Sequence, residues 1–246
     1  MIECVSKLHK LRKLKITLHY TRRRFDIPRE YEVDKLGKII AANPDLTHLD
    51  LVHFSRAESY SLTDLFRHVP LDRPLKLEHL GISEVFQTSF TIIPHIRSMT
   101  SCNFSNSQFL EPLLVSEVFP PIMDLASFDD FTVTYLTHHP GLTSLTLHEI
   151  DPEDIGNVLR ILTRHSKTLT CLGISASLLV QAFRDEQTLL HQYYNLRRLV
   201  LFYPFSSNIK YHFPPLLVSE FEDAFFYAEH FDRRRRYPSF LASGHY

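Results

Sequence analysis

Residues 142 to 147 read Leu-Thr-Ser-Leu-Thr-Leu, which places three leucines in the order apolar-x-x-apolar-x-apolar. Residues 46 to 51, Leu-Thr-His-Leu-Asp-Leu, carry the same order. A short apolar pattern that returns at intervals of about 20 to 50 residues indicates a repeat architecture. The further copies are Leu11/Leu14/Ile16, Leu77/Leu80/Ile82, Ile96/Met99/Ser101, Leu169/Leu172/Ile174 and Leu196/Leu199/Leu201, and a degenerate additional copy can be placed near Ile122/Leu125.

The segments that precede the copies show helical rather than strand periodicity. Apolar residues at helical spacing occur over 33–40, and Asn43-Pro44 ends this run because proline cannot continue a helix. They occur again over 155–162, where Asp151 is expected to cap the helix and Pro152 to occupy its first turn. The chain therefore alternates predicted strands with predicted helices.

Four carboxylates close together precede the second of these helices: Glu149, Asp151, Glu153 and Asp154. Their spacing is that of a helix cap, and the glycine of an EF-hand calcium loop does not follow them. We interpret them as capping and first-turn residues rather than as a calcium site.

A single strand and helix buries only about three strand side chains, each worth roughly 1.5 to 3 kcal/mol. Ordering each residue costs about 1 to 2 kcal/mol of backbone entropy, so one unit is not stable alone. Stacked units share their buried faces and form one continuous core. The sequence therefore predicts an α/β solenoid over residues 1–212, with about seven to eight irregular repeats, parallel strands on the concave side and helices on the convex side.

The two ends of the predicted solenoid differ. Apolar residues at helical spacing, namely Leu217, Phe221, Ala224, Ala228 and Phe231, predict a capping helix over 213–232. Residues 233–246 begin with four arginines and are expected to form a basic, flexible tail. A comparable cap is not evident before Leu11, so we expect an upstream domain or a partner to cover the N-terminal repeat.

The segments 46–54 and 142–150 resemble the leucine-rich repeat consensus in its ribonuclease-inhibitor-like form. The consensus asparagine or cysteine after the third apolar position is replaced by Phe54, Val85, Phe104 and Ile150, so the asparagine ladder of the family is missing. The irregular repeats, and phrases such as Asn43-Pro44-Asp45-Leu46-Thr47-His48-Leu49, look like the repeat region of fungal F-box proteins.

In the F-box family the repeats hold a protein substrate while an N-terminal F-box docks on the adaptor of a cullin-RING ubiquitin ligase. No F-box is visible here, because the first repeat starts at about residue 11. The resemblance thus implies a substrate-recognition module without its own F-box, and no enzymatic activity in this chain. The alternatives are an enzyme with an unrecognised surface site and a nonfunctional fragment of a larger F-box protein.

Composition narrows the class of protein further. The 246 residues include 27 basic and 28 acidic side chains, giving a net charge of −1, which disfavours a nucleic-acid partner. An apolar run long enough to span a membrane does not occur, and Met1–Arg24 does not resemble a secretory signal. Cys4, Cys102 and Cys171 are too scattered for a zinc site or a disulfide framework. We expect a cytoplasmic or nuclear protein without a cofactor.

The residues between the inward apolar positions of each strand are predicted to face the concave side, because side chains alternate along a strand. This surface is expected to bind a protein partner. The candidate contact residues are Lys13, Lys15, His48, Asp50, His79, Thr146, Arg198, Val200 and Phe202. Arg198 and Phe202 are the expected anchor point, since arginine and aromatic side chains dominate binding hot spots.

His48 and His79 occupy equivalent positions in adjacent copies, so the two imidazoles are expected about one strand spacing, 4.8 Å, apart. Such a pair could bind zinc or sense pH, although zinc requires further ligands. His138 and His139 are read as cations favourably placed at a helix C-terminus. The sequence contains none of the common nucleophile-elbow, phosphate-loop or zinc-protease motifs, so catalytic and metal-binding residues are not assigned.

Overall fold

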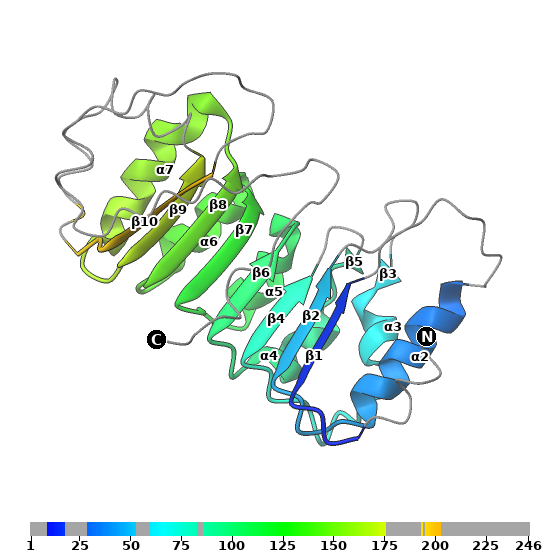
Figure 1. The fold of residues 1–246 in the computed structure, drawn as a ribbon. Helices are drawn as coiled ribbons and strands as arrows, with labels where there is room; N and C mark the ends of the chain where they lie inside the picture. The colour runs from blue at the N-terminus through cyan, green and yellow to red at the C-terminus, as the bar shows by residue number, and fades with distance from the viewer. Residues whose placement is uncertain are drawn as a thin grey trace.

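The structure, a computed structural model, describes residues 9–17, 29–52, 60–82, 86–175, 193 and 195–202. It contains an open sheet of eight parallel strands, in which each strand pairs with the one that precedes it and the one that follows it in this sheet (Figure 1). In spatial order the strands are β1 Lys13–Thr17, β2 His48–Val52, β4 His79–Ile82, β6 Ser101–Phe104, β7 Ile122–Ser127, β8 Ser144–Glu149, β9 Cys171–Ser175 and β10 Arg198–Phe202. The predicted α/β class and parallel pairing are confirmed.

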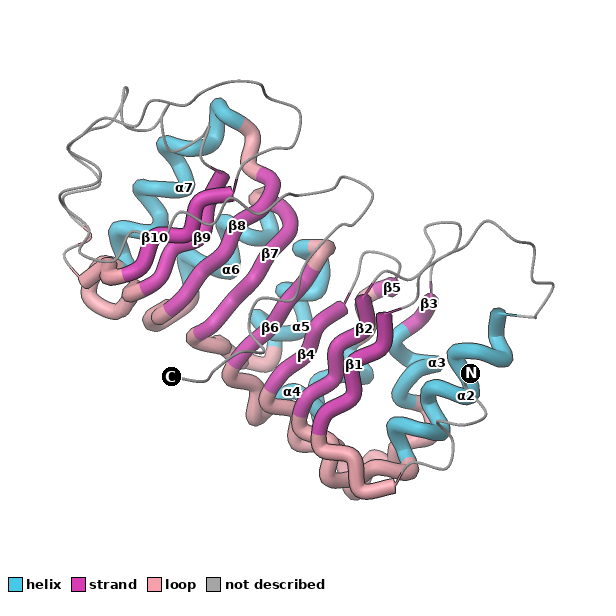
Figure 2. The backbone as a smooth tube through the Cα atoms, viewed as in Figure 1, coloured by secondary structure: helices cyan, strands magenta, loops and turns pink. Residues whose placement is uncertain are grey.

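Helices connect the strands. They are α2 Arg29–Ala41, α3 Leu62–Phe66, α4 Ile93–Ile96, α5 Leu110–Val115, α6 Asp130–His138 and α7 Ile155–Leu162, with short 3-10 turns at Phe90–Ile92, Ser107–Phe109, Pro152–Asp154 and Thr163–His165. Two further strands, β3 Tyr60–Ser61 and β5 Phe86–Gln87, form a separate short pair. Figure 2 shows α4 to α7 behind the sheet and the strands in front. We call the side with these helices the helix face and the opposite side of the sheet the front face.

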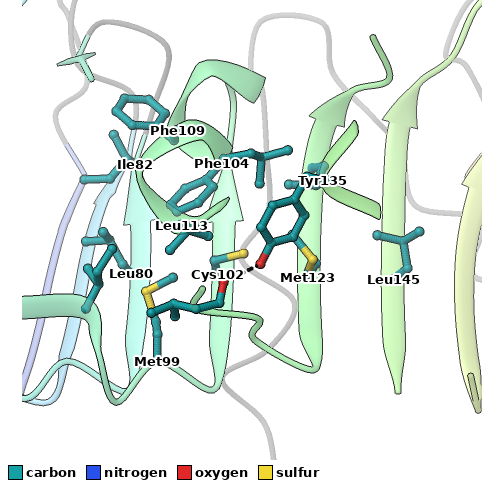
Figure 3. Packing of buried hydrophobic residues seen from close by; sticks show 14 of the residues in the cluster. Leu80, Ile82, Met99, Cys102, Phe104, Phe109, Leu113, Met123, Tyr135 and Leu145 are labelled. Carbon is teal, nitrogen blue, oxygen red and sulfur yellow. Dashed lines mark hydrogen bonds between the residues drawn. The ribbon is translucent and has the colours of Figure 1, made fainter. Parts of the chain in front are cut away.

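The inward side chains of the strands form the core against the helices. Leu49, Leu80, Leu145 and Leu172 are fully buried and occupy register-equivalent positions. Figure 3 shows Leu80, Cys102, Met123 and Leu145 on successive strands, with Tyr135 of α6 packed against them. The Tyr135 hydroxyl donates a 2.8 Å hydrogen bond to the Val118 carbonyl, which satisfies its polar atom within the core.

The fourth predicted copy was placed three residues too early. The side chains that enter the core there are Met99, Cys102 and Phe104, which are 6%, 0% and 1% exposed, so Ser101 faces outward instead. A pattern of aliphatic residues does not reveal this position, because Cys102 packs there as a small hydrophobe. In β7, at the degenerate copy, Met123 and Leu125 are the inward residues.

The Leu-Thr pair that begins many copies has a structural reason. The Arg12 carbonyl accepts hydrogen bonds from the backbone N–H groups of Thr47 and His48, at 2.8 and 3.0 Å, and from the Thr47 hydroxyl at 3.2 Å. The Thr143 carbonyl is bonded in the same way by residues 170 and 171. The threonine hydroxyl therefore adds a third hydrogen bond to each such junction between neighbouring strands.

Buried polar side chains link successive units near the ends of the helices. They are Asn43, His95, His139 and His165, which are 1%, 1%, 5% and 1% exposed. Asn43 Oδ1 accepts from Leu11 N–H at 2.8 Å, and His95 Nδ1 accepts from Leu75 N–H at 3.1 Å. His165 Nδ1 lies 3.4 Å from Leu142 N and its Nε2 lies 3.0 Å from the Leu136 carbonyl. These side chains therefore satisfy buried backbone N–H and C=O groups between successive units.

The prediction that His139 is a favourable cation is wrong. Its Nδ1 accepts a hydrogen bond from Gly141 N–H, and its Nε2 donates to the Pro120 carbonyl at 3.0 Å, which requires a neutral ring. Burial lowers the pKa of His139 from 6.5 to about 4, against the weaker opposite effect of the Pro120 hydrogen bond. Desolvation outweighs the attraction of the helix C-terminus for positive charge.

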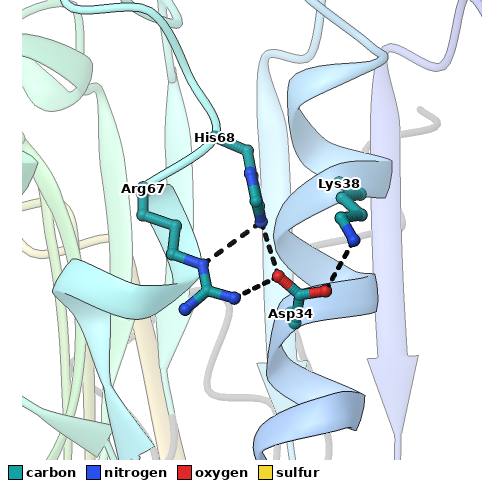
Figure 4. A network of polar contacts seen from close by, with 4 residues as sticks. All are labelled: Asp34, Lys38, Arg67 and His68. Carbon is teal, nitrogen blue, oxygen red and sulfur yellow. Dashed lines mark hydrogen bonds and ion pairs between the residues drawn. The ribbon is translucent and has the colours of Figure 1, made fainter.

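Helices α2 and α3 are joined by a polar network centred on Asp34 (Figure 4). The Asp34 carboxylate lies 2.7 Å from both Lys38 Nζ and His68 Nε2 and also contacts Arg67. Hydrogen bonds from Lys38, Arg67 and His68 hold the pKa of Asp34 well below its usual range. Gly37 lets the helices approach, because a Cβ there would lie 2.8 Å from the Leu65 carbonyl oxygen.

The expected helices over 33–40 and 155–162 are confirmed by α2 and α7. Asp151 occupies the N-cap position before Pro152, but its side chain makes no capping hydrogen bond, so the capping interpretation holds for position only. The predicted capping helix over 213–232 and the tail over 233–246 lie outside the described residues.

Substitution of Leu145 by alanine tests the shared core. Leu145 is fully buried in β8, between β7 and β9, so Leu145→Ala is expected to lower the free energy of unfolding by about 2 to 5 kcal/mol. Leu71→Ala is the matched control, since Leu71 is 75% exposed and should leave the stability unchanged. Urea denaturation measures both, and equal midpoints for the two variants would contradict the stacked core.

The buried histidines predict loss of stability in acid. Because the pKa of His139 falls from 6.5 to about 4 on folding, the unfolded chain binds the proton first, and the stability that is complete above pH 6.5 declines as the pH falls toward 4. That shift corresponds to at most about 3 kcal/mol. His139→Gln should flatten the decline in urea midpoint between about pH 7 and pH 5, whereas His138→Gln, at an exposed neighbour, should not. Equal pH dependence in the two variants would show that His139 is not buried neutral.

Candidate functional site

The front face carries two rows of outward side chains that cross all eight strands. In register order the first row is Lys13, His48, His79, Ser101, Ile122, Ser144, Cys171 and Arg198, and the second is Lys15, Asp50, Gly81, Asn103, Asp124, Thr146, Gly173 and Val200. Strand alternation places these rows opposite the leucines of the core. The two rows consist mainly of polar and small residues, with Ile122 and Val200 as apolar exceptions. In the second row Asp50, Gly81, Asp124 and Gly173 are buried.

The structure places the predicted contact residues in three groups. Lys13, Lys15, His48, Asp50 and His79 lie together on β1, β2 and β4. Thr146 lies on β8, and Arg198 and Val200 lie on β10 at the other end of the sheet. Phe202 ends β10, but its side chain is outside the described residues, so its proposed role as an anchor stays a prediction.

Lys15 and Asp50 form an ion pair between neighbouring strands. Lys15 Nζ lies 3.0 Å from Asp50 Oδ2, and the side chains are 42% and 13% exposed. The other carboxylate oxygen of Asp50 occupies the space above Gly81, where a Cβ would overlap it. Glycine at position 81 therefore makes room for the Asp50 carboxylate on the adjacent strand.

His48 and His79 are register partners, as the sequence predicted, and their ring centroids lie 5.9 Å apart with the planes tilted by 30°. His48 Nδ1 lies 2.9 Å from Thr47 Oγ1, and His79 Nδ1 lies 2.8 Å from Ser101 Oγ. These hydroxyls fix the orientation of both rings. Desolvation lowers the pKa of His48 and of His79 below 6.5, so both rings are neutral at pH 7.

Asp124 and His148 form a second pair near the middle of the front face. His148 Nε2 lies 2.7 Å from Asp124 Oδ1, and the side chains are only 5% and 6% exposed. His148 Nε2 is thus hydrogen-bonded to the Asp124 carboxylate. The pair joins β7 to β8, and its burial favours a structural link over a reactive centre.

Sequence reasoning missed Asn103 and Asp124 as front-face residues. Both lie in strands whose inward positions the repeat pattern placed wrongly or left weakly defined. The signal was present as Met99-x-x-Cys102-x-Phe104, which moves Ser101 and Asn103 to the outward side. The predicted copy Ile96/Met99/Ser101 would instead turn Ser98, Thr100 and Cys102 outward, and these residues do not belong to the front-face rows.

Two features are absent from the part of the chain that the structure describes. Groups of three or more histidine, cysteine, aspartate or glutamate side chains that could hold a metal ion are absent from it. None of its helices has the length and apolar character needed to cross a membrane. Cys102 is a buried free thiol and Cys171 a half-buried one, while Cys4 lies outside the described residues.

Comparisons with protein-family models, with curated proteins and with solved structures found no match for this chain.

The substitution Gly81→Ala tests whether the Asp50 carboxylate occupies the space above residue 81. Gly81→Ala is expected to destabilise the protein by about 1 kcal/mol, because the new Cβ forces Asp50 away from Lys15. In an Asp50→Ala background the same change should be neutral or stabilising, since alanine restricts the unfolded chain more than glycine does. A double-mutant cycle by urea denaturation measures this coupling, and additive effects would mean that Asp50 does not occupy the space above Gly81.

Proposed function

We propose that this chain is a leucine-rich repeat solenoid of the ribonuclease-inhibitor-like kind that works by binding another protein on its front face. The strictly sequential order of the parallel strands, the apolar-x-x-apolar-x-apolar pattern and the helices behind the sheet support this finer description of the fold. The observation that carries the proposed function is the pair of outward rows that crosses all eight strands.

A broad surface of this kind suits a protein partner better than a small substrate. Its outward side chains lie in rows across the strands and do not converge on one point. Enzyme and small-ligand sites, in contrast, gather polar groups in a concave pocket. Exposed and half-buried side chains such as Lys13, Thr146 and Arg198 are distributed along the whole sheet. The surface therefore offers many separate contacts, as protein interfaces do.

We further propose that the bound protein is a substrate recognised in an F-box-like ubiquitin-ligase context, without an F-box in this chain. The support is the resemblance of the repeat phrases to the repeat region of fungal F-box proteins. The cytoplasm or the nucleus, where such ligases act, is the compartment that this proposal requires.

Two separate variants test the binding function, one with an added arginine on the front face and one with an added arginine on the helix face. Thr146→Arg changes the centre of the front face, and Thr137→Arg changes an exposed position on α6 of the helix face. Proteins captured from the native organism by the wild-type chain should be retained by Thr137→Arg and lost by Thr146→Arg, with at least a tenfold loss of affinity once the partner is purified. Both variants must first show the wild-type thermal melt. Equal capture by the two variants would place the interface elsewhere.

The ligase context needs its own measurement. The protein is tagged at its native locus, and co-purification of a cullin-RING adaptor is the expected result. If the front-face partner co-purifies and the adaptor does not, protein binding stands and the ligase context is wrong.

A further inference from the structure

The charged side chains of the front face are sorted by sign and by exposure. Lys13, Lys15 and Arg198 are exposed cations. Asp50 and Asp124 are buried, at 9% and 4% exposure. Lys15 Nζ lies 3.0 Å from Asp50, and His148 Nε2 lies 2.7 Å from Asp124. Each carboxylate thus has a cationic or imidazole partner within the chain, although Asp50 Oδ1 is buried without a hydrogen bond to the described residues, and the exposed charges of the two rows are positive.

His48 and His79 follow Lys13 in the first row, and each ring has one nitrogen that no hydroxyl of the described residues engages. A hydroxyl engages Nδ1 of each ring, Thr47 for His48 and Ser101 for His79. Neither Nε2 is among the buried polar atoms without a partner, and neither makes a hydrogen bond within the described residues. Each ring therefore has Nε2 available to a ligand. Because the Thr47 hydroxyl donates to the Arg12 carbonyl, neutral His48 carries its proton on Nδ1, and its Nε2 donates to a carboxylate only once the ring is protonated. Ser101 can donate to His79 Nδ1, which leaves the proton of that ring on Nε2, where a carboxylate can accept a hydrogen bond from it.

We propose that the front face binds an acidic peptide segment of the partner protein, whose carboxylates contact Lys13, His48 and His79 at one end of the sheet and Arg198 at the other. This inference rests on the proposed function and adds the chemistry of the partner. Eight strands give seven spacings of about 4.8 Å, so the two ends lie about 34 Å apart. About ten extended residues span that distance.

A peptide fits this surface better than a nucleic acid. The described front-face rows hold three exposed cations, two of them at one end, and the whole chain has a net charge of −1. Nucleic-acid binding draws on many phosphate contacts along a continuous cationic track. The small residues between the two cationic ends, among them Ser144, Thr146 and Gly173, instead leave room for the backbone of an extended chain.

The proposed complex should take up protons. The charged groups that act on His48 are Lys13 and Glu78, and those that act on His79 are Asp50, Lys15, Asp124 and His48 itself. Burial keeps both rings neutral at pH 7, while a bound carboxylate favours the charged ring. Binding is therefore expected to strengthen as the pH falls from about 7.5 to about 6, where the histidines gain protons on contact with the ligand.

The probe is a synthetic peptide of about twelve residues that alternates glutamate with serine, long enough to join both ends. Isothermal titration of the full chain should show binding that tightens at least about threefold from pH 7.5 to 6, with net proton uptake. Lys13→Gln/Arg198→Gln should weaken it at least about fivefold, whereas the charge-matched helix-face variant Arg97→Gln/Arg160→Gln should not. His48→Gln/His79→Gln should abolish the pH dependence.

Several outcomes overturn the inference. The first is that the glutamate peptide does not bind at pH 6, and the second is that Lys13→Gln/Arg198→Gln and Arg97→Gln/Arg160→Gln bind it equally well. The third is that a lysine–serine peptide of the same length binds more tightly than the glutamate peptide. The fourth is that single-stranded DNA binds more tightly through the same residues. Circular dichroism at each pH separates loss of binding from loss of fold. If Thr146→Arg abolishes partner capture and the glutamate peptide does not bind, the proposed function stands and only the acidic chemistry falls.

Discussion

Neighbouring strands share the burial of one another's inward side chains, and this sharing explains the extended form of the sheet. Leu145 is fully enclosed because Met123 and Leu172 lie beside it on β7 and β9 and the helices lie behind. The apolar side chains of a lone strand would not offset the entropy of ordering it. The same dependence keeps the strands in register, since a slip of one residue would exchange the leucines with the polar row of the front face.

Register in turn creates the front face. Because equivalent positions stack from β1 to β10, an outward residue on one strand always meets its counterpart on the next. Asp50 can therefore use the space above Gly81, and His48 can lie against His79. The surface is thus built by the same alternation that builds the core, and a change of residue at one outward position is felt at its neighbours across the strands.

The sequence predicted the core rows well where the residues were aliphatic and poorly where they were not. The leucine copies at 46–51 and 142–147 predicted strand, register and outward residues correctly. Cys102 and Phe104 were misplaced because a cysteine in an apolar slot breaks a pattern defined by leucine. The buried set of Asn43, His95, His139 and His165 could not be predicted, since a histidine near a helix end has the same local sequence whether the next unit buries it or leaves it in water.

Two groups of histidines are expected to respond to a fall in pH with opposite effects: one on stability and one on binding. Protonation of the buried group, including His139 with its pKa of about 4, removes acceptors that satisfy backbone N–H groups and so favours the unfolded chain. Protonation of His48 and His79 on the front face leaves the core untouched and adds positive charge where the acidic ligand is proposed to bind. The loss of stability starts at about pH 6.5, where the unfolded chain begins to bind the proton, and ends near pH 4, the pKa of His139 in the folded chain. A bound carboxylate raises the proton affinity of the front-face rings, so binding is expected to strengthen from about pH 7.5 downward. The proposed complex therefore strengthens without loss of stability only above about pH 6.5, and below that pH stronger binding is accompanied by a less stable fold.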